Sequence, residues 1–210
     1  MPAEEPQRRT QKERRDATRA ALLDAALACL CDGGLAGFTT PGVCARAALS
    51  QGALFRHFPT KASLLAATAE HLFAALRAEY EARFSRLPAS RRTPEEGIRL
   101  LFRSMKDERL AAAYELYTAA RTDPDLRDAL GPIVRAHVAH LRNLGHSLMP
   151  TRDLAARDRF EALVDLSTLA MQGLVIEEMV LPDLATRRRL LASLGALAAS
   201  SPAPRPRGGN

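Results

Sequence analysis

The chain has 210 residues, enough for one large domain or two small ones, and a formal net charge of +6. It contains 39 alanines and 32 leucines but only six valines, three isoleucines, seven phenylalanines and three tyrosines. Because sheets favour β-branched and aromatic residues whereas helices favour Ala, Leu, Arg and Glu, this composition excludes a large sheet. It predicts an all-α fold.

Features of secreted and membrane proteins are missing from the sequence. The N-terminal stretch 1–16 is charged and holds no apolar run, unlike a signal peptide. The most apolar region, 160–181, is interrupted by Asp165, Gln172 and two glutamates, so it falls short of the roughly 20 apolar residues of a membrane span. The three cysteines cannot all pair, and we interpret them as small buried hydrophobic residues. We therefore expect a cytoplasmic protein with no membrane contact.

Apolar spacing, proline and glycine divide the chain into helices. A first helix is predicted over 12–30, ending at the Gly33-Gly34 pair, and two unusually short helices follow over 40–46 and 51–57. Longer helices are predicted over 61–86, 94–106, 108–121, 124–147, 152–180 and 184–199. Prolines mark most of the breaks, since proline is tolerated in the first turn of a helix but not in its interior.

The predicted organisation is an N-terminal three-helix bundle followed by a larger helical domain. The first domain covers 1–61 and includes a charged, flexible arm over 1–10. The second covers 62–200, and a tail rich in proline and glycine occupies 201–210.

The two short helices have the features of a helix-turn-helix. Thr39 is a good N-cap with Pro41 in the first turn behind it, and Ser50 caps the second helix. Leu54 and Phe58, spaced i and i+4, face inward. This pattern leaves the other face of the second helix free to enter the major groove of DNA. The residues on or near that outer face are Gln51, Gly52, Ala53, Phe55, Arg56 and His57.

Charge supports DNA binding by the same segment. Between Gly33 and Lys61 the chain has three cations, which are Arg46, Arg56 and Lys61, and no acidic residue. In a chain that is 26% charged, this stretch predicts a local positive field suited to phosphate. The alternative is a helical hairpin that only packs.

Several runs in this region match a known family. The runs are 34–40 (GLAGFTT), 54–58 (LFRHF) and 59–65 (PTKASLL). In identity and spacing they resemble the N-terminal DNA-binding domain of TetR-family transcriptional regulators, and the resemblance spans roughly residues 14–66. It implies a homodimer with a helical effector domain that diverges freely in sequence.

The segment also departs from the family pattern. Phe55 stands where an aromatic hydroxyl commonly bonds phosphate, and Ala53 replaces a common threonine. The elbow glycine is Ala48, which must then adopt a positive φ at a modest cost. The base-contacting surface is therefore expected to be small.

By mechanism, Gln51 can bond adenine and Arg56 can bond guanine, each through two hydrogen bonds. Thr39, Thr40 and Lys61 are expected to hold phosphates. These five positions, with the others on the outer face, form the predicted DNA-binding set.

Two further assignments stay open. His57 is either a DNA contact or a structural hydrogen-bonding residue at the helix end. Cations of the N-terminal arm either reach the DNA backbone or minor groove, or remain a solvated tail. They are Arg8, Arg9, Lys12, Arg14 and Arg15.

The larger domain mixes aromatic, thioether and polar side chains of the kind that line ligand pockets. The resemblance implies a pocket within the bundle, contacted by helices spanning 94–147 and 160–176. The alternative is that these residues are plain core. The candidates are Phe102, Met105, Tyr114, Tyr117, His137, His140, Met171 and Gln172.

The last two helices are predicted to form a dimer interface. Their apolar face is wider than one neighbour needs, and an isologous four-helix interface is the arrangement that the resemblance implies. The alternative is an intramolecular core. The candidates are Phe160, Leu163, Val164, Leu174, Leu190 and Leu194.

Together these observations predict a homodimeric regulator, more a repressor than an activator, that binds a palindromic double-stranded DNA operator and is released by a small-molecule effector. No catalytic residue, metal or cofactor is predicted. One alternative is a helical metal-dependent enzyme, for which His137 and His140 have a suitable spacing. The other is a protein-interaction module.

Overall fold

The computed structural model describes residues 10–148 and 154–200, and within these ranges it contains only helices. This confirms the predicted all-α class. The elements are α1 (Gln11–Gly37), α2 (Thr40–Ala47), α3 (Gln51–His57), α4 (Lys61–Ser85), the 3-10 helix η1 (Ala89–Arg91), α5 (Pro94–Met105), α6 (Arg109–Ala119), α7 (Pro124–Leu148), α8 (Leu154–Glu178) and α9 (Leu184–Ser200).

The helix boundaries agree with the sequence except at a few ends. Helix α1 continues past Leu30 to Gly37, and η1 has no counterpart among the predicted elements. The predicted start of a helix at residue 152, most of the arm and the whole tail lie outside the described residues. Helix α7 runs without interruption through Pro132.

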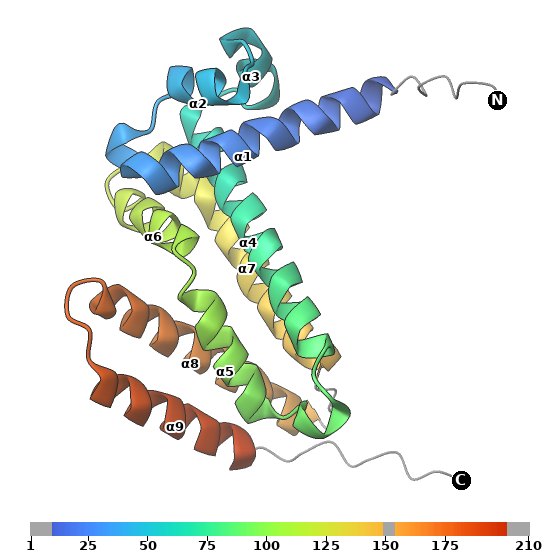
Figure 1. Ribbon diagram of the computed structural model, residues 1–210, viewed down its shortest axis with the longest axis vertical. Coiled ribbons are helices and arrows are strands. Elements are labelled where there is room, and N and C mark those ends of the chain that lie inside the picture. Colours follow the sequence, from blue (N-terminus) through green and yellow to red (C-terminus); the bar gives the residue numbers. More distant parts are fainter. Residues whose placement is uncertain (1–9, 149–153, 201–210) are drawn as a thin grey trace, which may run out of the picture.

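Helix α1 begins with a capping box. The Thr10 hydroxyl accepts a hydrogen bond from the Glu13 amide, and the Glu13 carboxylate accepts one from the Thr10 amide. The N-terminal half of α1 is exposed and projects beyond α4 (Figure 1). At its other end Gly34 has a φ of 59°, a conformation that favours glycine and breaks the helix.

The apolar face of α1 builds the core of the N-terminal domain. Leu22, Ala26 and Leu30 are buried there, beside Phe38 and Leu54. By length and composition alone α1 is long and apolar enough to cross a membrane. Here its apolar residues pack against α2, α4 and α6, as in the core helix of a globular domain.

The cysteines differ in environment. Cys44 is buried in the core and Cys29 is partly buried, but Cys31 is exposed. The prediction of three buried cysteines is therefore wrong for Cys31, which lies on the solvent side of α1.

Helix α4 connects the two halves of the molecule. It starts below α3, lies against α1 at its N-terminal end, and runs beside α7 for most of its length (Figure 1). Helices α5, α8 and α9 pack on one another at the end of the molecule remote from α3. Buried residues from all of these helices belong to one continuous apolar cluster.

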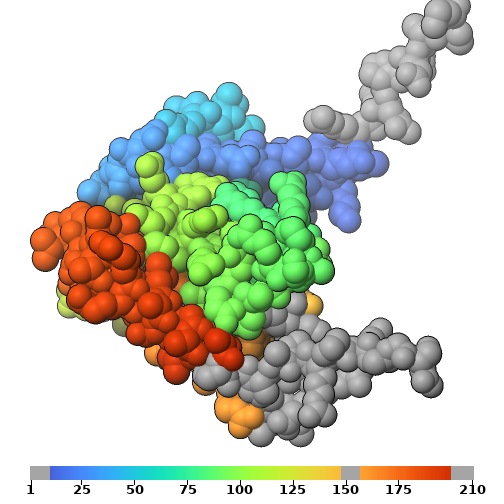
Figure 2. All heavy atoms as spheres, turned by 60° about the horizontal axis from the view of Figure 1, so that its bottom comes forward, coloured from blue at the N-terminus to red at the C-terminus, as the bar shows by residue number. Residues whose placement is uncertain are grey.

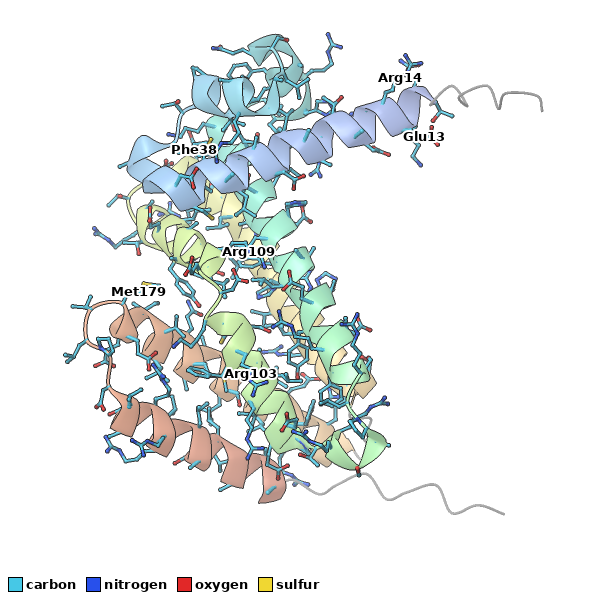
Figure 3. All side chains as sticks on the ribbon, in the orientation of Figure 1. Glu13, Arg14, Phe38, Arg103, Arg109 and Met179 are labelled. Atoms are coloured by element: carbon cyan, nitrogen blue, oxygen red, sulfur yellow. The ribbon has the colours of Figure 1, made fainter. Side chains whose placement is uncertain are left out.

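An ion cluster fixes the junction between α5 and α6. The Arg109 guanidinium donates to Asp107 Oδ1 over 2.8 Å and to Glu79 Oε1 on α4 over 3.0 Å. Hydrogen bonding to Arg109 keeps the pKa of Asp107 below its ordinary value. Figure 3 shows Arg109 at this junction. The start of α6 is thereby tied to α4.

The turn between α2 and α3 depends on a left-handed residue, and this yields a stability prediction. Ala48 has a φ of 53° and a ψ of 41°, as expected from its place at the family's elbow glycine. Ala48→Gly should leave the free energy of unfolding unchanged or raise it by up to about 1 kcal/mol, because relief of strain is partly offset by chain entropy. Ala48→Val should lower it by about 1–3 kcal/mol, because a β-branched residue fits this conformation poorly.

The matched control is Ala45→Val, in the interior of α2 where the backbone is helical and the side chain is exposed. This change should cost only about 0.5 kcal/mol. Denaturant unfolding of the three variants provides the comparison. A valine that costs no more at position 48 than at position 45 would contradict the role of the elbow.

Candidate nucleic-acid interface and central cavity

Helix α3 presents the face that the sequence predicts. Gln51, Gly52 and Arg56 are exposed, and the Phe55 ring is 42% exposed although it is apolar. On the opposite side Leu54 is fully buried. Ala53 and His57, also in the predicted set, are partly buried. The helix thus packs on the core through Leu54, and its opposite face is not covered by any described part of the chain.

The caps of α2 and α3 are formed by side chains that remain near the surface. Thr39 Oγ1 accepts from the Gly42 amide over 3.2 Å, and Ser50 Oγ accepts from the Ala53 amide over 3.2 Å. Both hydroxyl protons stay available to donate to a phosphate. Thr40, the second threonine of the pair, is partly buried.

Lys61 has an internal partner that sequence reasoning missed. Its Nζ donates to the Phe38 carbonyl over 2.9 Å and lies 5.5 Å from the centre of the Phe38 ring. Phe38 lies at the joint between α1 and α2 (Figure 3). Lys61 therefore ties the start of α4 to this joint, and two of its ammonium protons remain for other acceptors.

The positive field at α3 comes from Arg56 and Lys61, as predicted, and from cations of α1, whereas Arg46 contributes less than predicted. The Arg46 guanidinium donates to Asp32 Oδ2 over 2.5 Å, so an acid just outside the acid-free stretch neutralises it. Cations of α1 take its place. Burial, followed by the charges of Arg15, Arg19 and Arg56, lowers the pKa of His57.

Arg19 was not among the predicted DNA-binding residues. Its guanidinium lies 5.4 Å from the centre of the Phe58 ring, directly behind α3. The i, i+4 spacing of Arg15 and Arg19 on the exposed side of the first helix was the available signal. Arg14 lies farther out along α1 (Figure 3), and Arg8 and Arg9 lie outside the described residues.

A cavity of about 510 Å³, here called the central cavity, lies inside the larger helical part. It is lined by α4, α5, α6, α7 and α8, and its wall is mostly apolar. Five of the predicted ligand-binding residues line it: Met105, Tyr114, Tyr117, His137 and Gln172.

Three predicted ligand-binding residues do not line the central cavity. The ring of Phe102 is buried elsewhere, with the cations of Lys106 and Arg187 5.9 and 5.8 Å from its centre. Met171 is wholly buried in the core, and His140 is exposed on the outer side of α7. These positions were predicted from residue type alone. Which side chains face the cavity depends instead on how each helix is rotated about its axis.

Sequence reasoning also missed the contribution of α4. Phe73, Arg77 and Tyr80 line the cavity at i, i+4 and i+7, a single face of α4. The Arg77 Nη1 donates to His137 Nδ1 over 2.8 Å, and the His137 ring stacks on Phe73 with centroids 4.1 Å apart. Burial, together with the charge of Arg77, lowers the pKa of His137 to about 4, so this imidazole is neutral at pH 7.

His137 and His140 do not form a metal site together. One faces the cavity and the other faces solvent. Among the described residues no group of three His, Cys, Asp or Glu side chains is placed to hold a metal ion. Although the two histidines lie three positions apart on one helix, they do not belong to a group of metal ligands among the described residues.

The predicted dimer residues face inward. Phe160, Leu174 and Leu194 are buried, Leu163 and Val164 line the cavity, and Leu190 is partly buried. Within one chain these side chains therefore pack inward, which is the arrangement of the alternative, an intramolecular core. The large apolar side chains that are exposed on and between the last two helices are Leu166, Leu169, Ile176, Met179, Val180, Leu181, Leu184 and Leu197.

Comparison with known proteins agrees with this geometry. The family model for bacterial regulatory proteins of the tetR family matches residues 22–68, which hold α2, α3 and parts of α1 and α4. An HTH-type transcriptional regulator from Mycobacterium tuberculosis is 30% identical over 189 residues, covering 90% of this chain and 96% of its own. The HTH-type transcriptional regulator CymR from Pseudomonas putida is 30% identical over 174 residues, covering 83% and 85%.

Solved structures share the fold. The multidrug binding protein EbrR, complexed with imidazole, superposes with a TM-score of 0.59 at 23% identity, covering 90% of this chain and 98% of its own. A TetR-family regulator from Rhodococcus sp. superposes with a TM-score of 0.65 at 20% identity, covering 87% and 99%.

The relatives are transcriptional regulators and not enzymes, and they match the chain along most of its length. The helix-turn-helix of α2 and α3 is therefore a DNA-binding element, in place of an enzyme site or a protein-interaction hairpin. The chain belongs to the TetR family of transcriptional regulators.

Proposed function

We propose that this regulator is a homodimeric repressor that binds a palindromic operator and is released when a small molecule enters the central cavity. The observation that carries the proposal is the position of α6. One side of this helix lines the cavity, and the other holds the end of α1. Residues 1–61 would act as the DNA-binding domain and 62–200 as the effector-binding and dimerisation domain, in the cytoplasm.

The proposed DNA contacts follow from exposure and charge. Gln51 and Arg56 are the polar side chains exposed on α3, and they are the ones able to read adenine and guanine. The hydroxyl of Thr39 and the ammonium of Lys61 would hold phosphates on either side. Arg15 and Arg19 would extend this positive surface along α1.

Dimerisation is proposed through the exposed faces of α8 and α9. Leu166 and Ile176 form an exposed apolar face of α8 that does not line the cavity, and Leu169, also exposed, lines the cavity as well. Helix α9 lies on the outside of the molecule, where Figure 2 shows it as a continuous red surface. Pairing these faces about a two-fold axis would match a palindromic operator, whose half-sites lie about 34–36 Å apart.

The proposed coupling runs through Glu115 on α6. Its Oε2 accepts from the Leu35 amide over 2.6 Å, just after the break at Gly34. A Cβ added at Gly34 would lie 2.9 Å from this oxygen, so the carboxylate fits closely against the backbone. Tyr114 and Tyr117, beside Glu115 in sequence, line the cavity.

A ligand that moves the two tyrosines would therefore shift Glu115 and the end of α1. Because α1 packs against α2, which carries α3, and shares an apolar core with Leu54 of α3, its position affects the orientation of the recognition helix. Release requires that the ligand bind one of two conformers more tightly than the other.

A first prediction concerns the source of the positive field. Arg19→Ala should weaken binding to all DNA sequences several-fold and reduce the salt slope of log affinity by about 1, because one phosphate contact is lost. Arg46→Ala should change the slope much less, because Asp32 already neutralises Arg46. Fluorescence anisotropy with an operator selected from a random pool, repeated at several salt concentrations, measures both. Equal slope changes would refute the assignment.

A second prediction concerns the dimer. Leu166→Asp places a charge on a side chain that is 48% exposed and does not line the cavity, and it should weaken dimerisation by roughly 2 kcal/mol or more if that face is buried between copies. Ala74→Asp, at an exposed position of α4, is the control and should leave the dimer intact. Sedimentation velocity gives the oligomeric state. A Leu166→Asp protein that remains as dimeric as the control would show that the interface lies elsewhere.

A third prediction concerns the coupling. Glu115→Ala removes the acceptor of the Leu35 amide, so hydrogen exchange at this amide should accelerate and operator affinity should change several-fold. Glu108→Ala, an exposed glutamate just before α6, is the control. If both variants exchange and bind like the parent protein, α6 does not position α1 through this contact.

A further inference from the structure

The central cavity contains a cation that no acidic side chain balances. From this we infer that the effector is an apolar monocarboxylate whose carboxylate pairs with Arg77. The inference rests on the proposed function, because it names the ligand class of the same cavity.

The charges that face the cavity do not cancel. Its charged lining residues are Arg77, Arg142 and Asp165. Arg142 Nε donates to Asp165 Oδ1 over 2.9 Å, and a second hydrogen bond joins Nη2 to Oδ2, so this pair is neutral as a unit. Arg77 makes no ion pair within the described part of the chain, which leaves the wall with a net charge of +1.

Among the described residues, no acidic group inside the cavity faces Arg77. Glu70 acts on it electrostatically, but this glutamate is exposed and lies two turns earlier on α4. His137 accepts from Arg77 through Nδ1, and its lowered pKa keeps it neutral at pH 7. The guanidinium itself stays charged, since even with burial lowering its pKa an arginine does not lose its proton in this range.

The guanidinium is also held in place for a ligand. Stacking of His137 on Phe73 fixes the acceptor, and the hydrogen bond to Nδ1 fixes one end of the Arg77 fork. One of five N–H donors is used, so the others can bind both oxygens of a carboxylate. A pre-ordered fork loses less side-chain entropy on binding than a free lysine would.

The remaining wall favours an apolar body. Leu76, Ile98, Leu101 and Met105 line it along with several aromatic rings. A volume of about 510 Å³ lies within the range of small-molecule pockets. In such surroundings an ammonium ligand would meet an uncompensated positive wall, and a neutral ligand would leave Arg77 unpaired.

A second observation also indicates a ligand that carries oxygen. The hydroxyls of Ser104 on α5 and Ser167 on α8 are buried and have no hydrogen-bond partner among the described residues. Both serines line the cavity, on helices other than those that carry Arg77 and His137. Buried hydroxyls are normally paired, so these two favour a guest with polar oxygen atoms.

The test compares matched ligands that differ only in charge. Octanoate, decanoate and phenylbutanoate are each titrated into the purified full-length protein by calorimetry, alongside the corresponding primary amides and amines. The acids should bind about tenfold or more tightly than their amides, and the amines should bind least. Release of operator DNA is measured separately by fluorescence anisotropy with the same compounds.

Variants tie the preference to Arg77. Arg77→Gln should remove the tenfold preference for acids over amides while amide affinity stays within a few-fold. Arg77→Lys should retain part of it. Arg86→Gln, at the exposed C-cap of α4 and outside the cavity, is the matched control and should bind like the parent. Thermal unfolding verifies that each variant is folded.

The outcomes separate this inference from the proposed function. If acids bind through Arg77 but DNA stays bound, the ligand class holds and release by a cavity ligand fails. If amides or amines bind more tightly than acids, or if none of the acids binds, the ligand class is overturned. An acid preference that survives Arg77→Gln also overturns it.

Discussion

A single apolar core along α4 holds the molecule together. Near its start Leu64 and Leu65 pack with α1 in the DNA-binding domain, and farther along Phe73 and Leu76 form a wall of the central cavity. A helix is stiff because of its hydrogen bonds, so α4 is a rigid connection between the two regions. Helix α6 adds a second connection through Glu115, at a glycine break where the backbone comes close to the carboxylate.

Polar groups are placed differently at the two functional regions. At α3 they are exposed, and the cations of α1 act over solvent, where salt screens them. In the cavity Arg77 and the neutral His137 lie in mostly apolar surroundings, where the charge of Arg77 interacts strongly with any partner. The first arrangement suits a long polyanion bound in many registers, whereas the second suits one small ligand bound in one orientation.

Local sequence signals predicted the helix-turn-helix well. Thr39 and Ser50 cap their helices, Leu54 and Phe58 face the core, and Ala48 adopts the left-handed conformation expected of it. Each of these depends on neighbours within a few residues, so the chain alone contains the necessary information. The net charge around α3 could not be predicted from residues close to it in the sequence. Arg46 forms an ion pair with Asp32, and Arg19 lies over the Phe58 ring. Both contacts depend on how α1 packs against α2 and α3.

The sequence by itself determined the helical class and most helix boundaries, since these follow from composition, capping and spacing. The family of the DNA-binding domain was indicated by resemblance, through the identity and spacing of short runs such as 54–58 (LFRHF). Only the tertiary structure decided which face of each long helix looks inward. The apolar residues of α8 between Phe160 and Ile176 lie on several sides of the helix, so its sequence could not tell the cavity-lining Leu163 from the exposed Leu166. The pairing of Arg77 with His137, 60 positions apart, arose in the same way, because it is the packing of α4 on α7 that brings them together.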